Sequence, residues 1–199
     1  MKFFILIAIM IGSYSTVFAQ NVYSIYSRVS PPSTSSGNGA QFGAGVDIVY
    51  NVKNVMFDVD MSYVNEAKLY VGDGKTVRTQ LEGLFNIYDS FYVGGGVLAG
   101  KHSNSQYTKV QYQPIASLHY RPSITRDIYV SLLFPAYGND NNVSGVRGGY
   151  RGTFPLKSGT SSWGLFSQIE LTYIRFISGG NNYSSASTTF GIGISKITK

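Results

Sequence analysis

Charged side chains at alternating positions are the residues of this sequence best suited to chemistry. Side chains of a β-strand point to its two faces in turn, and acids and arginines fall here on the same face of the expected strands. The acids are Asp47, Asp58, Asp60, Glu82 and Glu170, and the arginines are Arg28, Arg78, Arg121, Arg147 and Arg151. Such groups can form ion pairs, line a charged channel or transfer protons.

Two histidines offer the other chemistry that the sequence allows. His102, followed by Ser103 and Asn104, is expected at the end of a strand. There it is either a catalytic base or a solvated loop histidine. His119 is on the polar face beside Arg121, and we expect it to form hydrogen bonds rather than to bind a ligand. Two separated histidines and no cysteine predict neither a metal site nor a cofactor.

The charged faces belong to a series of amphipathic strands. In one of them, Phe42, Val46 and Ile48 share an apolar face, whereas Asp47 is on the other face. The pattern predicts strands at 21–29, 40–52, 54–65, 76–88, 91–103, 108–121, 128–137, 145–156, 162–177 and 187–198. Tight turns alternate with junctions that are mostly longer, including 66–75 and 179–186. Pro114 falls inside an expected strand, where a bulge would accommodate it.

A closed barrel explains this series better than a water-soluble sandwich. Strands that all carry one apolar and one polar face can turn the apolar face to lipid and enclose the polar face. Short turns that alternate with longer loops are typical of outer-membrane barrels, which have an even number of strands. The sequence therefore predicts an all-β, antiparallel, up-and-down transmembrane barrel over 20–199, with ten strands, or eight as the alternative.

The first residues indicate export. Lys2 precedes an apolar stretch over 3–11, and the small residues of 17–19 resemble a cleavage site, so 1–19 is expected to be a secretory signal peptide. Charged residues make up only 13% of the chain and aromatic residues 15%. That composition suits a bacterial outer-membrane barrel with aromatic girdles. The net charge of the full chain is +6. For an exported barrel with such a basic balance, lipopolysaccharide phosphates or a merely solvated surface are expected rather than nucleic acid.

Strand pairing predicts how the inner charges meet. A two-residue turn predicts that Asp47 lies opposite Asp58, and the next pairing predicts Asp60 near Glu82. Carboxylates that close repel one another unless a cation intervenes. Arginines of the strand 145–156 are expected to reach across from the opposite wall. The result is a salt-bridge network, which would be a structural plug, a narrow pore with acidic and basic walls, or a catalytic carboxylate cluster.

Lysines gather near the second and third external loops of the expected barrel. They are Lys68, Lys75, Lys101 and Lys109. They are expected either to contact lipopolysaccharide phosphates or to be solvated. The other expected partners are outer-membrane lipid and the barrel-assembly machinery, and the sequence does not specify an oligomeric state.

The chain resembles the small outer-membrane barrels of the opacity and outer-membrane-protein-A type, on the strand pattern of 20–199. Its end, 191–199, lacks the terminal aromatic residue of the usual assembly signal. Stretches 41–45, 82–83 and 189–194 look like TraO-type conjugal-transfer outer-membrane proteins. We expect a non-enzymatic structural or interaction role for this barrel, with its lumen plugged by the salt-bridge network. A solute pore, a component of conjugal transfer or export, and a hydrolase or protease that uses His102 are the alternatives.

Overall fold

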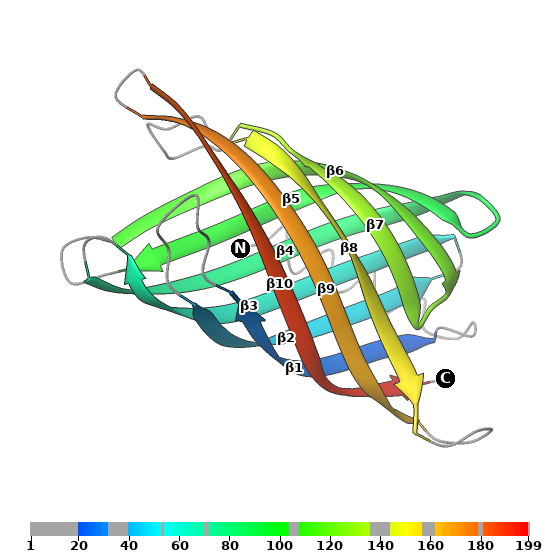
Figure 1. Ribbon diagram of the computed structural model, residues 1–199. Coiled ribbons are helices and arrows are strands. Elements are labelled where there is room, and N and C mark those ends of the chain that lie inside the picture. The colour runs from blue at the N-terminus through cyan, green and yellow to red at the C-terminus, as the bar shows by residue number, and fades with distance from the viewer. Residues whose placement is uncertain are drawn as a thin grey trace, which may run out of the picture.

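The structure is a computed structural model, and it consists of β-strands joined by turns and loops (Figure 1). It describes residues 20–31, 40–52, 54–69, 72–103, 108–135, 144–156, 162–178 and 181–198. The expected signal peptide, 1–19, lies outside the described residues. No helix within the described residues is long and apolar enough to cross a membrane.

Ten strands follow one another along the chain. They are β1 (Asn21–Ser30), β2 (Gln41–Val52), β3 (Val55–Leu69), β4 (Gly72–Tyr88), β5 (Phe91–Ser103), β6 (Thr108–Ser123), β7 (Arg126–Leu133), β8 (Ser144–Pro155), β9 (Trp163–Ser178) and β10 (Asn181–Thr198).

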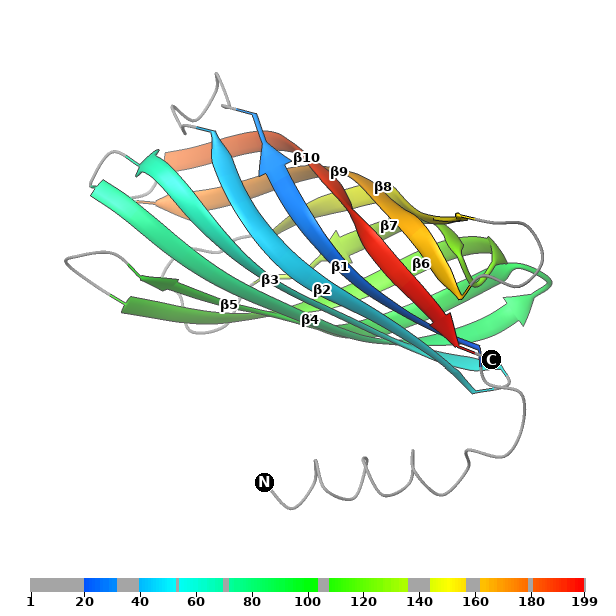
Figure 2. The ribbon, with the colours of Figure 1, turned by 90° about the horizontal axis from the view of Figure 1, so that it is seen from below.

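Each strand pairs antiparallel with the next, and β1 pairs with β10 to close the barrel (Figure 2). Asn21 faces Thr198 across this closing seam, and the hydroxyls of Ser24 and Ser195 form a 2.8 Å hydrogen bond there. The prediction of a closed up-and-down barrel with ten strands, rather than eight, is confirmed.

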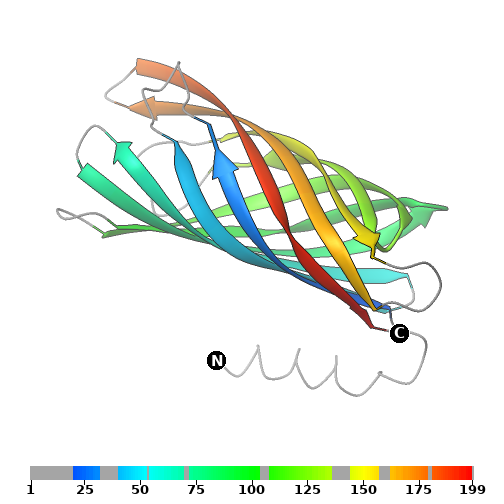
Figure 3. The same ribbon diagram turned by 60° about the horizontal axis from the view of Figure 1, so that its bottom comes forward.

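The two ends of the barrel differ. The start of β1 and the end of β10 lie at one end, which we call the terminal end (Figure 3). The turns after β2, β4 and β6 are also at this end and are tight. One of them contains Asp89, whose φ of 45° is in the left-handed region that asparagine and aspartate tolerate best among the residues with side chains.

At the opposite end, two hairpins are longer than the sequence predicted. The junctions expected at 66–75 and 179–186 are largely paired strand, because β3 extends to Leu69 and β10 begins at Asn181. Glu66 and Asp73, which we expected in a loop, belong to β3 and β4, and their side chains lie outside the described residues. We predicted loops there because these segments are polar. A strand that extends beyond the bilayer needs no apolar face, so polar residues can still form a strand.

β7 spans Arg126–Leu133 instead of the predicted 128–137. The place where β7 ends explains how β6 accommodates Pro114. The register between β5 and β6 is continuous, so the predicted bulge at Pro114 is wrong. Pro114 lies where β7 ends, and its carbonyl accepts a 3.0 Å bond from the Phe134 N–H. The proline cannot return that bond, and the Gln113 side-chain amide donates to the Phe134 carbonyl instead, at 2.9 Å. A side chain thus replaces the missing backbone donor.

The two faces of the wall have opposite character. Large apolar side chains are exposed on the outside of every strand, among them Ile25 at 63% and Leu171 at 59%. The acids predicted to lie inside are buried, and Asp58 is 0% exposed. Arg175 is exposed on the outer face near the end of β9. An apolar exterior around ionised groups is the reverse of a water-soluble protein and suits surrounding acyl chains.

Candidate functional site

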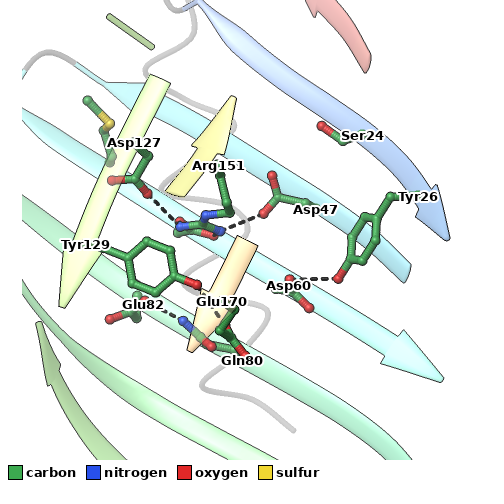
Figure 4. Close-up of polar contacts among 12 residues, drawn as sticks. Ser24, Tyr26, Asp47, Asp60, Gln80, Glu82, Asp127, Tyr129, Arg151 and Glu170 are labelled. Atoms are coloured by element: carbon green, nitrogen blue, oxygen red, sulfur yellow. Dashed lines mark hydrogen bonds and ion pairs between the residues drawn. The ribbon is translucent and has the colours of Figure 1, made fainter. Parts of the chain in front are cut away.

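The predicted salt-bridge network lies inside the barrel, and its centre is Arg151 of β8 (Figure 4). One guanidinium nitrogen lies 2.9 Å from Asp47 of β2. The other lies 2.5 Å from Asp58 of β3 and 2.8 Å from Asp127 of β7. Arg121 of β6 adds 2.8 Å contacts to both Asp58 and Asp127. These five residues, which we call the Arg151 cluster, join five strands across the lumen.

His119 extends this cluster toward β4. Its Nδ1 is 2.9 Å from an Asp127 oxygen, and its Nε2 is 3.9 Å from Glu82. The ring stacks on Tyr129 at a centroid distance of 5.6 Å. His119 is therefore enclosed between two carboxylates and an aromatic ring, and it is 0% exposed. The expectation of a hydrogen-bonded lumen histidine is confirmed.

Glu170 of β9 organises a second group of charges. The Tyr129 hydroxyl donates to one Glu170 oxygen at 2.7 Å, and Arg78 lies 3.2 Å from the other. Arg147 Nε is 3.5 Å from the oxygen that Tyr129 contacts. We call Arg78, Tyr129, Arg147 and Glu170 the Glu170 cluster. The guanidinium carbons of Arg151 and Arg147 lie 5.0 and 5.8 Å from the Tyr129 ring centroid, so this ring contacts an arginine of each cluster.

Uncharged polar side chains form hydrogen bonds with the other charged side chains inside the barrel. The Tyr26 hydroxyl donates to Asp60 at 2.8 Å, and Gln80 donates to Glu82 at 2.5 Å. Arg28 donates to Ser62 at 2.9 Å and to Thr189 at 3.4 Å. Arg28 is only partly buried, because it lies toward the end of the barrel opposite the termini. These bonds continue the polar packing beyond the Glu170 cluster.

The register differs from the predicted one by two residues in each of two hairpins. Asp47 lies opposite Asp60, not Asp58, because Val52 pairs with Val55 where β2 and β3 meet. Glu82 lies opposite Asp58, not Asp60. Because a shift of two residues preserves the face of every side chain, the carboxylates still gather inside, but their cations are assigned differently.

Sequence reasoning missed three contributors to the site. Asp127 was expected in a turn, but β7 begins at Arg126 and Asp127 is its first inward residue. Tyr26 and Tyr129 were counted only among aromatic residues typical of interfaces, yet both are buried and donate to carboxylates. Exposed and buried residues alternate strictly along β7. The sequence does not reveal this alternation, because the residues after Ser131 are apolar whichever face they are on.

One glycine makes room for this packing. A β-carbon on Gly149 would collide with the backbone oxygen of Ile169 and lie 3.1 Å from the Tyr129 hydroxyl. We expect Gly149→Ala to lower the free energy of unfolding by about 1–3 kcal/mol, the usual cost of overpacking. Gly83→Ala is the matched control, since nothing lies within 4 Å of the β-carbon it would add. Urea unfolding in detergent should separate the two variants, and equal effects would contradict the packing argument.

The other candidate residues are placed only in part. His102 belongs to β5, where its backbone pairs with Thr76 and Lys109, but its side chain lies outside the described residues. The same holds for the side chains of Lys68 and Lys109. Lys75 and Lys101 are exposed. Within the described residues, no group of three or more His, Asp or Glu side chains is placed to hold a metal ion.

The geometry of the charged side chains inside the barrel favours a structural role over catalysis. A general base needs a nucleophile or substrate within reach of its free nitrogen. The free nitrogen of His119 instead faces the Glu82 carboxylate, in a site closed to solvent. Carboxylates and arginines are directly paired across the lumen, so the acidic and basic walls that the sequence predicted touch one another.

The closed strand order, the apolar exterior and the ionised interior together define an integral β-barrel of the bacterial outer membrane. Among solved structures, the chain is similar to Neisserial surface protein A, with 14% identity over 90% of this chain and 98% of that chain, at a TM-score of 0.41. It is also similar to the translocator domain of the autotransporter NalP from Neisseria meningitidis, with 13% identity over 98% of this chain and 94% of that chain, at a TM-score of 0.47.

Neither resemblance is strong enough to bear on what the chain does. No family model matches the chain, and no curated protein is similar to it in sequence. The likeness to TraO-type conjugal-transfer proteins stays a prediction.

Proposed function

We propose that the chain is a non-enzymatic outer-membrane barrel with a structural or interaction role, whose lumen is sealed by its ion-pair network. The observation that carries this proposal is the position of Arg151, which contacts Asp47, Asp58 and Asp127 from three other strands. These three contacts hold the Arg151 side chain across the lumen. A solute that passed through the barrel would have to displace it. The protein then acts through its surface and not through transport.

The outer surface supports one class of partner. Lys75 of β4 pairs with Ser103, and Lys101 of β5 pairs with Val77, so the two lysines are diagonal neighbours on the outer face. Diagonal pairs of this kind are about 7–8 Å apart. Both are near the end opposite the termini: Lys101 is level with the exposed Val77, and Lys75 lies just beyond it. That is the level at which lipopolysaccharide phosphates lie in the external leaflet, and we propose them as the ligand of this pair.

Bilayer recordings test the sealed lumen. We expect the purified protein, reconstituted in planar bilayers, to give no single-channel steps, because the Arg151 cluster blocks passage. Heat-modifiable migration of the same sample in detergent gels would verify that the barrel is folded. Discrete steps whose size changes in Arg147→Ala or Arg151→Ala would overturn this function in favour of a narrow pore.

A further inference from the structure

We propose that Arg147 holds a small monovalent inorganic anion, of the chloride class, inside the barrel. The proposal goes beyond the sealed lumen, because a sealed barrel needs no bound ion. Arg147 is one of the most deeply buried side chains of the protein, at 1% exposure, although it carries a full positive charge.

The hydrogen-bonding groups of Arg147 are not matched by the protein. Within the described residues, none of its three guanidinium nitrogens has a hydrogen-bond partner. Ser131, its direct cross-strand neighbour on β7, is 0% exposed, and its hydroxyl has no partner within the same residues. Buried donors are almost always satisfied, since an unsatisfied one costs free energy. The position therefore offers a guanidinium and a hydroxyl to an acceptor.

Charge within the Glu170 cluster points to an anion as that acceptor. Arg78 and Arg147 both contact Glu170. Asp60 also attracts Arg78. Arg28 is a third positive charge near Glu170, so three arginines face two carboxylates. Tyr129 and Arg78 already bond to the two oxygens of Glu170. Glu170 lies near Nε of Arg147, which leaves the two Nη groups at the far edge of the guanidinium. Water could accept hydrogen bonds there but would leave the excess charge unbalanced.

Neighbouring charges do not remove this requirement. The Arg151 cluster has three carboxylates and two arginines, so its net charge is opposite. Its carboxylates are occupied by Arg151, Arg121 and His119. Thr172, the other cross-strand neighbour of Arg147, is uncharged. The near-complete burial of Arg147 restricts the ligand to a small ion.

Thermal and urea unfolding of the full protein in detergent can test the site. Sodium chloride or bromide is compared with sodium gluconate at the same ionic strength, because gluconate is too large to enter. We expect a saturable effect of halide, with a roughly hundredfold lower unfolding equilibrium constant at a concentration a hundredfold above the dissociation constant. Arg147→Met should abolish the halide effect. Arg28→Met should retain it, because Arg28 bonds to Ser62 and Thr189 instead.

Bromide also tests the site without a variant, which matters if Arg147→Met does not fold. Crystals of the unaltered protein grown in sodium bromide should show an anomalous scattering peak within hydrogen-bond distance of the Arg147 Nη atoms. A water molecule at that position in bromide, or identical unfolding in halide and gluconate, would overturn the proposal. Neither readout depends on conductance, so failure here is distinguishable from failure of the sealed-lumen function.

Discussion

Replacing Arg151 with methionine should lower the free energy of unfolding by about 3–5 kcal/mol, the cost of removing one partner from a buried ion pair. Methionine retains much of the length of the side chain but not its charge. Asp47, Asp58 and Asp127 would then remain in the lumen with fewer cations, and Asp47 would lose the ion pair that it makes with Arg151. Urea unfolding of refolded protein in detergent micelles measures the change.

Two comparisons identify the cause of that loss. Arg175→Met removes an exposed arginine of the outer face, and we expect it to change stability by no more than about 0.5 kcal/mol. Adding Asp47→Asn to Arg151→Met should restore part of the lost stability, because it removes the carboxylate that was left without its cation. A loss that is the same with and without Asp47→Asn would mean that packing, and not charge, explains the role of Arg151.

Replacing Ile169 with arginine should lower the free energy of unfolding in lipid vesicles by about 2–4 kcal/mol, the cost of a cation near the bilayer midplane on the outside of a barrel. Ile169 lies in the middle of β9 and is 47% exposed. In a water-soluble protein, an arginine at such an exposed position would change stability by no more than about 0.5 kcal/mol. The variant thus measures directly whether this surface faces acyl chains.

Depth provides the control for that measurement. Tyr173 is on the same strand and face, two outward positions closer to the end of β9. Tyr173→Arg should cost only about 0–1 kcal/mol, as substitutions near the interface do. Equal costs at the two positions, or no cost at either, would contradict a membrane-spanning orientation.

Period-two alternation was sufficient to predict the wall of this barrel and the side on which most of its charges lie. Asp47, Asp58, Asp60, Glu82 and Glu170 are all buried, because the face of a residue depends only on parity within its strand. Which residues meet depends on the register, and that requires the position of each turn. The pairing of Val52 with Val55, which the predicted turn did not allow, changed the partner of Asp47.

The alternation of residues within each strand does not predict which side chains meet across the lumen. Arg151 and Asp58 are 93 residues apart in sequence and meet only because the sheet closes. Tyr129 contacts charged residues of both clusters, yet nothing in its sequence neighbourhood distinguishes it from a tyrosine at the bilayer interface. Asp127 was assigned to a turn because the start of β7 was placed two residues too late. Such errors are local, but each one removes a member of a network that spans five strands.

The seam between β1 and β10 has a consequence for biogenesis. Residues 21–29 pair with residues 190–198, so β1 and β10 each lack one neighbour until both strands are in place. No partial barrel is free of open edges, and each such edge invites pairing with another chain. Hairpins of consecutive strands can form earlier, but the closing pair cannot. The assembling chain therefore keeps two open edges, and the risk of aggregation that they bring, until β1 meets β10.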